Sequence, residues 1–274
     1  MVIWTNEILI AMNSLSNSGR VILPVEESSN YLFHYTNEMD HLVSIMNDYF
    51  KPFFCVESIE FLGFPKSIIN EMVCPVVCFC DLPLSRQKEH KSKFGDYGIA
   101  MKKEWGKEKL LTPVVYSHPR SMTAVSLRIL IDMANLLQEK LTEEEFGKFR
   151  NAVSILIMYH KAYEGKQYIK KDKMFADKTT RFYDEREWRY LPLEVDGLKW
   201  NLDITEHQND DALPKENEII QRNNKLKFNL NDIEFLFLKE ESEIEPFLSQ
   251  MRPRYSEEEI DLIRKKIQPF EKIA

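Results

Sequence analysis

The chain has 274 residues, of which 43% are apolar and 12% aromatic, so it is long enough to bury a sizeable core. Its 37 basic and 44 acidic residues give a net charge of -7, which excludes a general electrostatic attraction to nucleic acid or anionic membranes, although not a local basic groove. No stretch approaches the ~18 uninterrupted apolar residues of a membrane span, and we expect a soluble, cytoplasmic protein.

Short strands and helices alternate through the first half of the chain. Residues 1–30 are predicted to form a short helix and a loop rich in Asn and Ser, and Tyr31–Tyr35 is predicted to be a strand. Thr36 or Asn37 can cap the helix that follows. A polar helix is expected from Pro83 to about Lys93. Four further segments have a strand pattern: Phe50–Val56, Val73–Cys80, Tyr97–Met101 and Pro113–Tyr116.

Three of the four cysteines lie in the apolar run Val73–Cys80. Reduced cysteine in a buried strand behaves as a small hydrophobe, which suits a reducing compartment. A zinc site is the alternative, but the C-x3-C-x-C spacing of Cys74, Cys78 and Cys80 lacks the paired C-x2-C knuckles of common zinc sites. We therefore expect no bound metal.

A pair of helices is predicted at about residues 121–160. Leu130, Met133 and Leu137 recur on one face of the first helix, and Thr142 with Glu145 forms a capping box for the second. The remaining expected elements are a loop at 161–181, a long strand at Phe182–Leu193, a helix at Glu216–Asn224, a strand at Ile233–Leu238 and a last helix capped by Ser256 and Glu259.

Strands scattered among unequal helices favour an α+β fold over a regular βαβ sheet. We expect one domain spanning residues 1–274, with the helical pair as an insertion. Neither G-x-G-x-x-G nor G-K-[ST] occurs, which argues against a Rossmann or P-loop nucleotide site.

The first candidate site is His34-Tyr35-Thr36, where a predicted strand ends and a helix begins. The free backbone N–H groups of a helix N-terminus suit an anionic ligand. His34 can donate to a ribose hydroxyl and Thr36 can cap the helix. In the simpler interpretation, His34 only satisfies a backbone carbonyl.

The second candidate is Glu185-Arg186-Glu187-Trp188-Arg189. On a strand, Glu185, Glu187 and Arg189 share one face because side chains alternate. They form either a solvated ladder of salt bridges or one wall of a ligand cleft. In a cleft, one glutamate can stabilise a developing oxocarbenium ion while the other orients an acceptor nucleophile.

The third candidate is Tyr97-Gly98. Gly98 permits close approach of a backbone or ligand, and Tyr97 is able to stack on a planar ring. An ordinary core tyrosine at the start of a strand fits the same pattern.

Taken in order, these segments resemble the AbiGi family of abortive-infection proteins, which confer phage resistance and are often described as the antitoxin side of a pair. The resemblance covers about residues 30–193. The segments that carry it are Phe33-His34-Tyr35-Thr36, Cys78-Phe79-Cys80-Asp81-Leu82-Pro83-Leu84-Ser85, Tyr97-Gly98-Ile99-Ala100-Met101-Lys102-Lys103-Glu104-Trp105, Pro113-Val114-Val115-Tyr116 and Glu185-Arg186-Glu187-Trp188-Arg189.

The order His, Tyr, Glu also resembles the ADP-ribosyltransferase superfamily. That resemblance implies a split antiparallel sheet with surrounding helices, and NAD as the substrate. It places His34 near the NAD ribose and Tyr97 on the nicotinamide, while Glu187 supports cleavage of the glycosidic bond. Glu185-x-Glu187 is similar to the E-x-E signature of some of these enzymes, although their Ser-Thr-Ser strand is missing here.

Two classes of function follow from these resemblances. The first is an NAD-using toxin or effector with Glu187 and Glu185 as catalytic residues, and with His34, Tyr35, Thr36, Tyr97 and Arg189 as residues that bind NAD. Its acceptor would be a protein or a nucleic acid. The second is a non-catalytic antitoxin or regulator that holds a partner in the same cleft or on the helical pair. Across the two classes, the expected protein partners are a cognate toxin, an antitoxin or a phage-derived trigger.

Overall fold

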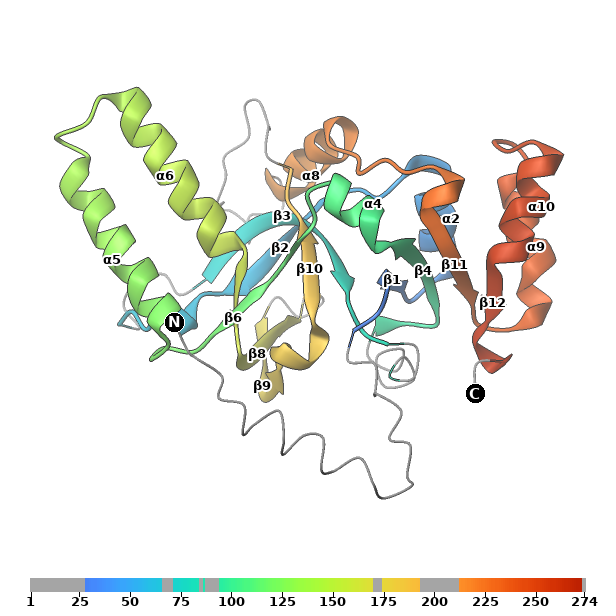
Figure 1. The fold of residues 1–274 in the computed structure, drawn as a ribbon, viewed down its shortest axis with the longest axis horizontal. Helices are drawn as coiled ribbons and strands as arrows, with labels where there is room; N and C mark the ends of the chain where they lie inside the picture. The colour runs from blue at the N-terminus through green and yellow to red at the C-terminus, as the bar shows by residue number, and fades with distance from the viewer. Residues whose placement is uncertain are drawn as a thin grey trace, which may run out of the picture.

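The computed structural model describes residues 28–65, 71–83, 86, 94–169, 174–192 and 212–272. Within these residues, eight strands form one sheet in the order β12-β11-β4-β1-β3-β10-β5, with β2 also paired to β3 (Figure 1). Its pairs are antiparallel apart from β11 with β12. The strands are β1 (Tyr31–Thr36), β2 (Phe53–Ser58), β3 (Glu71–Cys80), β4 (Tyr97–Lys102), β5 (Thr112–Pro113), β10 (Glu187–Tyr190), β11 (Ile233–Leu238) and β12 (Ile267–Pro269).

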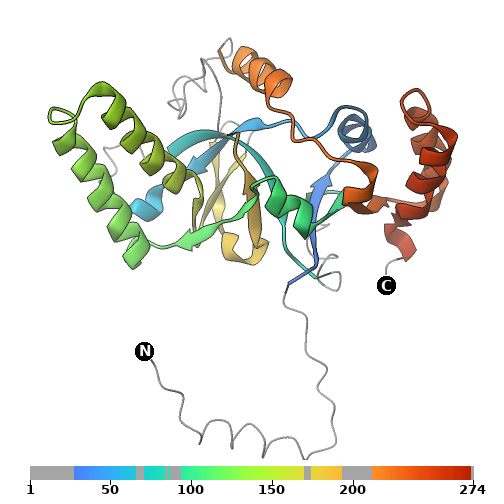
Figure 2. The same cartoon turned by 45° about the horizontal axis from the view of Figure 1, so that its top comes forward.

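Seven α-helices surround the sheet in the described part of the chain, and the mixed helix and strand content confirms the expected class at that level. Helices α5 and α6 lie at one end of the molecule and α9 and α10 at the other, in both views (Figures 1 and 2). The helices are α2 (Met39–Asp48), α4 (Lys103–Glu108), α5 (Met122–Leu137), α6 (Glu143–Met158), α8 (Ala212–Asn223), α9 (Ile244–Met251) and α10 (Glu257–Lys266). None of the described helices is long and apolar enough to span a bilayer.

Two smaller sheets of two strands each accompany the main sheet in the described part of the chain. Strands β6 (Val115–Ser117) and β7 (His160–Ala162) pair in parallel, and β8 (Glu164–Ile169) and β9 (Met174–Arg181) form an antiparallel hairpin. The prediction of a loop at residues 161–181 is therefore wrong. Both strands of the hairpin are polar and largely exposed, so the sequence lacks the alternation that marks a half-buried strand.

The largest apolar cluster lies between one face of the sheet and helices α2, α9 and α10. Alternation along β1 and β4 places Leu32, Ile99 and Met101 on this face. The helices contribute residues at helical spacing, among them Leu42 and Met46 of α2. This burial fixes the right-hand half of Figure 1 around β1, which carries the His34 segment, and its partner β4.

Strands β1 and β3 pair over a very short length and then diverge. They share one register position, Phe33 opposite Cys80, whereas β1 pairs with β4 along its whole length. The first six residues of β3 pair with β2 instead, and its last four residues pair with β10. Pro75 lies in this first part of β3, which among the described strands has a partner on one side only, and a missing backbone N–H is tolerated there.

The ends of several elements test the capping predictions. The capping boxes of Thr142 with Glu145 and Ser256 with Glu259 are both present. The predicted cap of α2 is wrong, because Glu38 occupies the N-cap position without a side-chain bond. The Thr36 hydroxyl instead donates to the carbonyl of Glu38 at 2.9 Å.

The predicted strand Phe182–Leu193 is shorter than expected. Phe182–Glu185 forms a 3-10 turn, η4, and Arg186 has a left-handed backbone with φ 44°, so the strand begins only at Glu187. A helix and a loop were predicted for residues 1–30, of which residues 1–27 lie outside the described part of the chain. Of the helix predicted for residues 83–93, the structure describes Pro83 and Arg86 alone.

Candidate functional site

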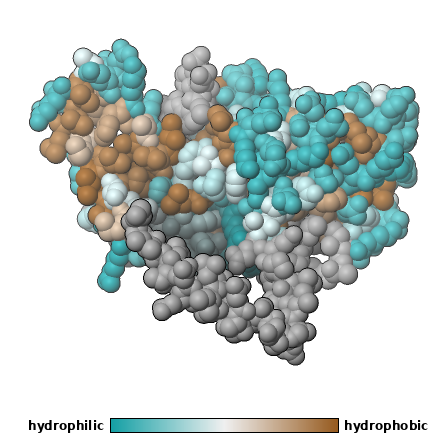
Figure 3. Space-filling model, in the orientation of Figure 1, coloured by the Kyte–Doolittle hydropathy of each residue, from teal (hydrophilic) through white to brown (hydrophobic). Residues whose placement is uncertain are grey.

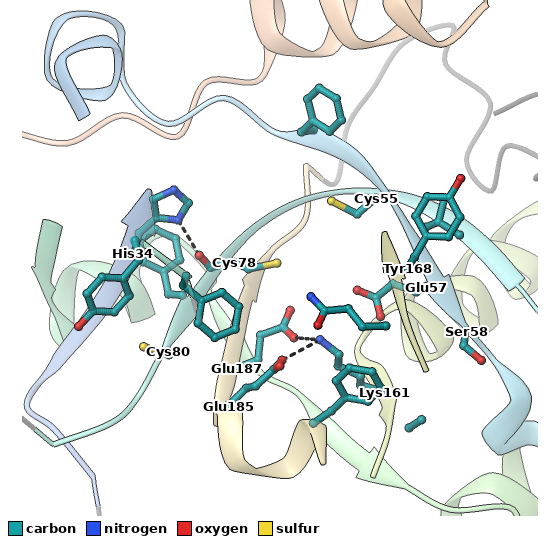
Figure 4. A pocket seen from close by; sticks show the side chains of 18 of the residues that line it. His34, Cys55, Glu57, Ser58, Cys78, Cys80, Lys161, Tyr168, Glu185 and Glu187 are labelled. Carbon is teal, nitrogen blue, oxygen red and sulfur yellow. Dashed lines mark hydrogen bonds and ion pairs between the residues drawn. The ribbon is translucent and has the colours of Figure 1, made fainter. Parts of the chain in front are cut away.

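A cavity of about 430 Å³ opens where β1 and β3 diverge (Figure 4). Its walls come from β1, β2, β3, the turn η4 and strands β7 to β10, so segments far apart in the sequence meet here. Aromatic rings such as Phe54, Phe79 and Phe182 line much of it. Its volume falls within the ~300–1,000 Å³ of sites for small molecules.

The floor of the cavity is a buried ion network centred on Glu187, which is 5% exposed. Its Oε1 accepts from Arg189 Nε at 2.5 Å, and its Oε2 accepts from Lys161 Nζ at 2.7 Å. Lys161 also reaches Glu185 Oε2 at 3.1 Å, and Arg189 Nη2 reaches Glu57 Oε1 at 3.0 Å. In Figure 4, Glu185 and Glu187 both point toward the Lys161 ammonium.

These charges fix one another's protonation states. Burial by itself opposes ionisation of Glu187, but the adjacent Arg189 and Lys161 outweigh it and hold the pKa of the carboxyl well below its usual range. Burial also disfavours the charged form of Lys161, yet the three nearby carboxylates raise the pKa of its ammonium. Glu187 and Lys161 are therefore ionised across the physiological range.

Local structure explains how Glu187 reaches this position. The left-handed Arg186 turns the chain from η4 into β10, and alternation along β10 then directs Glu187 and Arg189 to the same face. The backbone N–H of Glu187 donates to the Tyr116 hydroxyl at 2.8 Å. Glu185 joins the cluster from η4 and not from the strand, so the predicted shared face holds for Glu187 and Arg189 alone.

Arg189 lies beneath the cavity and binds two of the carboxylates that line it, those of Glu187 and Glu57. It is fully buried, does not line the cavity, and also donates from Nη1 to the Met158 carbonyl at 2.7 Å. Its bonds hold Glu187 and Glu57 in place, and its predicted part in binding a cofactor stays a prediction.

His34 lies on the opposite wall. Its Nδ1 is 2.7 Å from the carbonyl oxygen of Cys78, which can only accept, so Nδ1 carries the proton. Burial lowers the pKa of the imidazole, which favours the neutral ring. Nε2 then has a free lone pair, and among the described residues no partner uses it. His34 can therefore accept from a ligand hydroxyl, which reverses the donor role predicted from the sequence.

The other predicted ligand-binding residues divide between two cavities and the core. Tyr35 lines the main cavity and also a second one of about 380 Å³, which Thr36 lines as well. Tyr97 lines neither: its ring packs in the apolar core and its hydroxyl donates to Glu243 at 2.7 Å. The structure thus brings His34, Glu185 and Glu187 together and leaves Tyr97 apart.

The second cavity is more polar than the first. It shares His34, Tyr35 and Phe94 with the main cavity, and Asn37, His41 and Lys51 also line it. The shared wall makes the two cavities neighbours.

Two residues of the network were not found from the sequence. Lys161 lies in the segment predicted to be a loop, and Glu57 follows the predicted strand Phe50–Val56. A lysine and a glutamate alone give no motif. The available signal was that the two carboxylates of Glu185 and Glu187 need more positive charge than Arg189 supplies.

The cysteines lie beside this network as thiols. Cys74, Cys78 and Cys80 occupy alternate positions of β3, and burial raises the pKa of each. Within the described ranges, no three His, Cys, Asp or Glu side chains converge as a metal site.

Comparisons with known proteins bear on the family of the chain. A family model described as "Putative abortive phage resistance protein AbiGi, antitoxin" matches residues 48–239. The "Abortive phage resistance protein AbiGi" of Lactococcus lactis subsp. cremoris is 26% identical over 249 residues, which covers 82% of this chain and 98% of that protein. No solved structure matches the chain.

Proposed function

The chain belongs to the AbiGi family of abortive phage resistance proteins, and from this premise we propose that it is the antitoxin of a phage-defence pair. The matched segment 48–239 contains most of the cavity, including Glu57, Lys161 and Glu187. An antitoxin acts by holding its toxin, so it needs a stable binding surface and no reactive group.

The observation that carries this proposal is the state of Glu187. Both of its carboxylate oxygens are engaged by buried cations. A carboxylate held in this way is a poor general base, because its pKa lies well below neutral. The network instead gives the cavity a rigid charged floor, and Glu57 retains an oxygen with no hydrogen-bond partner among the described residues. A basic side chain of the toxin suits this floor and the aromatic walls.

Expression in cells tests the antitoxin function. Expression of the chain alone should leave growth unaffected, and its co-expression with the product of the neighbouring gene should relieve the toxicity of that product. Purified together, the two proteins should elute as one complex. Toxicity of the chain alone, without any relief of the neighbour's toxicity, would overturn the proposal.

An NAD-using, ADP-ribosyltransferase-like activity is the second candidate. It is supported by the meeting of His34, Glu185 and Glu187 in one cavity, at the position where a mainly antiparallel sheet divides. The cationic pyridinium of NAD suits the carboxylates of the main cavity. Lys51 and His41 of the second cavity suit its phosphates.

The chemistry of this candidate is the cleavage of one bond. The C–N bond between ribose and nicotinamide breaks, and nicotinamide leaves with the bonding electron pair. The ribosyl oxocarbenium ion is stabilised by the ionised Glu187 and captured by water or by an acceptor hydroxyl, whose proton passes to solvent or Glu185. His34 would accept a hydrogen bond from a ribose hydroxyl through Nε2.

Calorimetry with NAD and assays of nicotinamide release, with and without phage lysate, test the second candidate. Glu185→Gln should abolish release, while Asp184→Asn is the matched control, because Asp184 lies next to Glu185 but is half exposed and pairs only with Arg181 among the described residues. Absence of NAD binding under all conditions would leave the antitoxin function alone.

A further inference from the structure

Two hydrogen-bond acceptors that line the main cavity have no donor among the described residues. The first is Oε2 of Glu57, whose side chain is 15% exposed and whose Oε1 is bound to Arg189 Nη2 at 3.0 Å. The second is Nε2 of His34, on the opposite side of the cavity in Figure 4, since its Nδ1 is bound to the Cys78 carbonyl. A buried acceptor without a donor is costly, so both groups favour a ligand that supplies N–H or O–H groups.

The cations near Glu57 are shared with other groups or lie at the rim. Lys161 Nζ is bound to two other carboxylates, at 2.7 and 3.1 Å. Arg189 does not line the cavity, and it also holds Glu187 through Nε. Lys166 lines the cavity, but it is exposed and can turn toward solvent. The Glu57 carboxylate therefore presents a negative charge that a cationic ligand can reach from inside the cavity.

The walls of the cavity suit a flat, weakly hydrated cation. Phenylalanine and tyrosine rings line it from β1, β2, β3, η4, β8 and β9. Apolar side chains also gather on the surface over α5 and α6 (Figure 3), but the rings of the cavity surround buried charges. The Lys161 ammonium already lies 4.8 Å from the centroid of the Phe182 ring, so the cavity accommodates a cation against an aromatic face. A guanidinium stacks on such rings and is more weakly hydrated than an ammonium, so its burial costs less.

We propose that the main cavity binds a guanidinium group, which contacts Glu57 through its N–H edge and the aromatic walls through its plane. This group has N–H donors and no acceptor, so it matches the two acceptors that lack a donor. His34 Nε2 is available to a second donor group of the same ligand. The guanidinium belongs either to an arginine side chain of the toxin or to a free guanidine compound. The inference goes beyond the antitoxin function, because the site does not require a toxin as its ligand.

Calorimetry of the purified full chain with agmatine tests the class of ligand, because agmatine joins a guanidinium to an ammonium through a butyl chain. We expect a dissociation constant on the order of 0.1–1 mM, as suits a small ligand with one charge-assisted contact and an aromatic face. Cadaverine has the same charge and a similar length but carries ammonium groups alone, and it should bind ~5-fold or more weakly. Equal affinities for the two compounds, or no binding of agmatine up to ~10 mM, would overturn the proposal.

Substitution of Glu57 locates the site. Glu57→Gln keeps the size of the side chain but removes its charge, and should weaken agmatine binding by ~10-fold or more. Glu60→Gln is the matched control, because Glu60 is exposed in the turn η2 (Glu60–Leu62) and does not line the cavity. Urea denaturation shows whether each variant is folded, and the comparison of the two ligands on the wild type stands without either variant. Wild-type affinity for agmatine in folded Glu57→Gln contradicts the proposal.

Competition separates the two sources of the guanidinium. If an arginine of the toxin occupies the cavity, agmatine at a saturating concentration should release the toxin from the complex, and Glu57→Gln should weaken that complex. If a free guanidine compound occupies it, agmatine should bind without releasing the toxin. Relief of toxicity is scored separately. A chain that binds agmatine but does not relieve the toxicity of the neighbouring gene product overturns the antitoxin function and supports the guanidinium site.

Discussion

Replacement of Glu187 by Gln should destabilise the fold strongly, although the two side chains have nearly the same size. Glu187 stands between Arg189 Nε at 2.5 Å and Lys161 Nζ at 2.7 Å, and all three groups are buried. Removing one partner of a buried ion pair typically costs about 3–5 kcal/mol, because it leaves an uncompensated buried charge. In the variant, Arg189 still pairs with Glu57 and Lys161 still pairs with Glu185. We therefore expect a loss at the lower end of this range, about 3 kcal/mol.

Urea denaturation of the wild type and Glu187→Gln measures this loss directly as a difference in the free energy of unfolding. Glu144→Gln is the control, since Glu144 pairs with Lys148 on the surface with both side chains at least 75% exposed, and should be indistinguishable from the wild type. An unfolding free energy for Glu187→Gln within about 1 kcal/mol of the wild type would refute the idea that the network is a stabilising ion cluster.

The pH dependence supplies a second check on Glu187. Its folded-state pKa lies below the ordinary value of 4.5, so the unfolded chain takes up the proton first as the pH falls. The stability due to this carboxylate is full above pH 4.5 and declines by about 1.4 kcal/mol per pH unit below it. Glu187→Gln lacks this contribution, and the two stability curves should therefore converge in acid.

Three further predictions concern local structure. Gly95→Ala should lower the free energy of unfolding by more than about 2 kcal/mol, because φ is +127° and the new Cβ would lie 2.0 Å from the Thr36 carbonyl oxygen; an equilibrium unfolding curve like that of the wild type would contradict this. Thr142→Ala should cost about 1 kcal/mol through loss of its capping box, as measured by thermal melting, and no change would discount the cap. Cys74 and Cys80 should resist a thiol reagent at pH 8 until the chain is denatured, since burial raises their pKa; prompt reaction in the native state would show that β3 opens.

Elements governed by local chemistry were predictable from the sequence. The strand Ile233–Leu238 is an apolar run with turn residues before it, and its bounds match β11. The capping boxes at Thr142 and Ser256 depend on residues three apart, and both are present. The apolar run Val73–Cys80 likewise lies within β3.

The candidate site was predictable only in part, because its geometry depends on long-range contacts. The carboxylates Glu185 and Glu187 were identified, but the reason given for Glu185 was wrong: it reaches the cavity from η4, through the turn at Arg186, and not along the strand. Lys161 was missed because its strand pairs with β6, more than forty residues earlier, so nothing nearby in the sequence marks it. Tyr97 was assigned to the cavity from its place in the motif order, whereas its ring packs in the apolar core.

The order of strands in the main sheet constrains how the chain folds during synthesis. Strand β4 lies between β1 and β11, yet β11 begins about 130 residues after β4 ends, a stretch that a ribosome takes roughly 7–26 s to translate. Throughout that interval the edge of β4 that later pairs with β11 lacks this partner strand. Strand β12, which pairs with β11, is synthesised later still. The nascent protein therefore carries an open sheet edge until β11 has been synthesised, and we expect slow or reduced translation to make it dependent on chaperones.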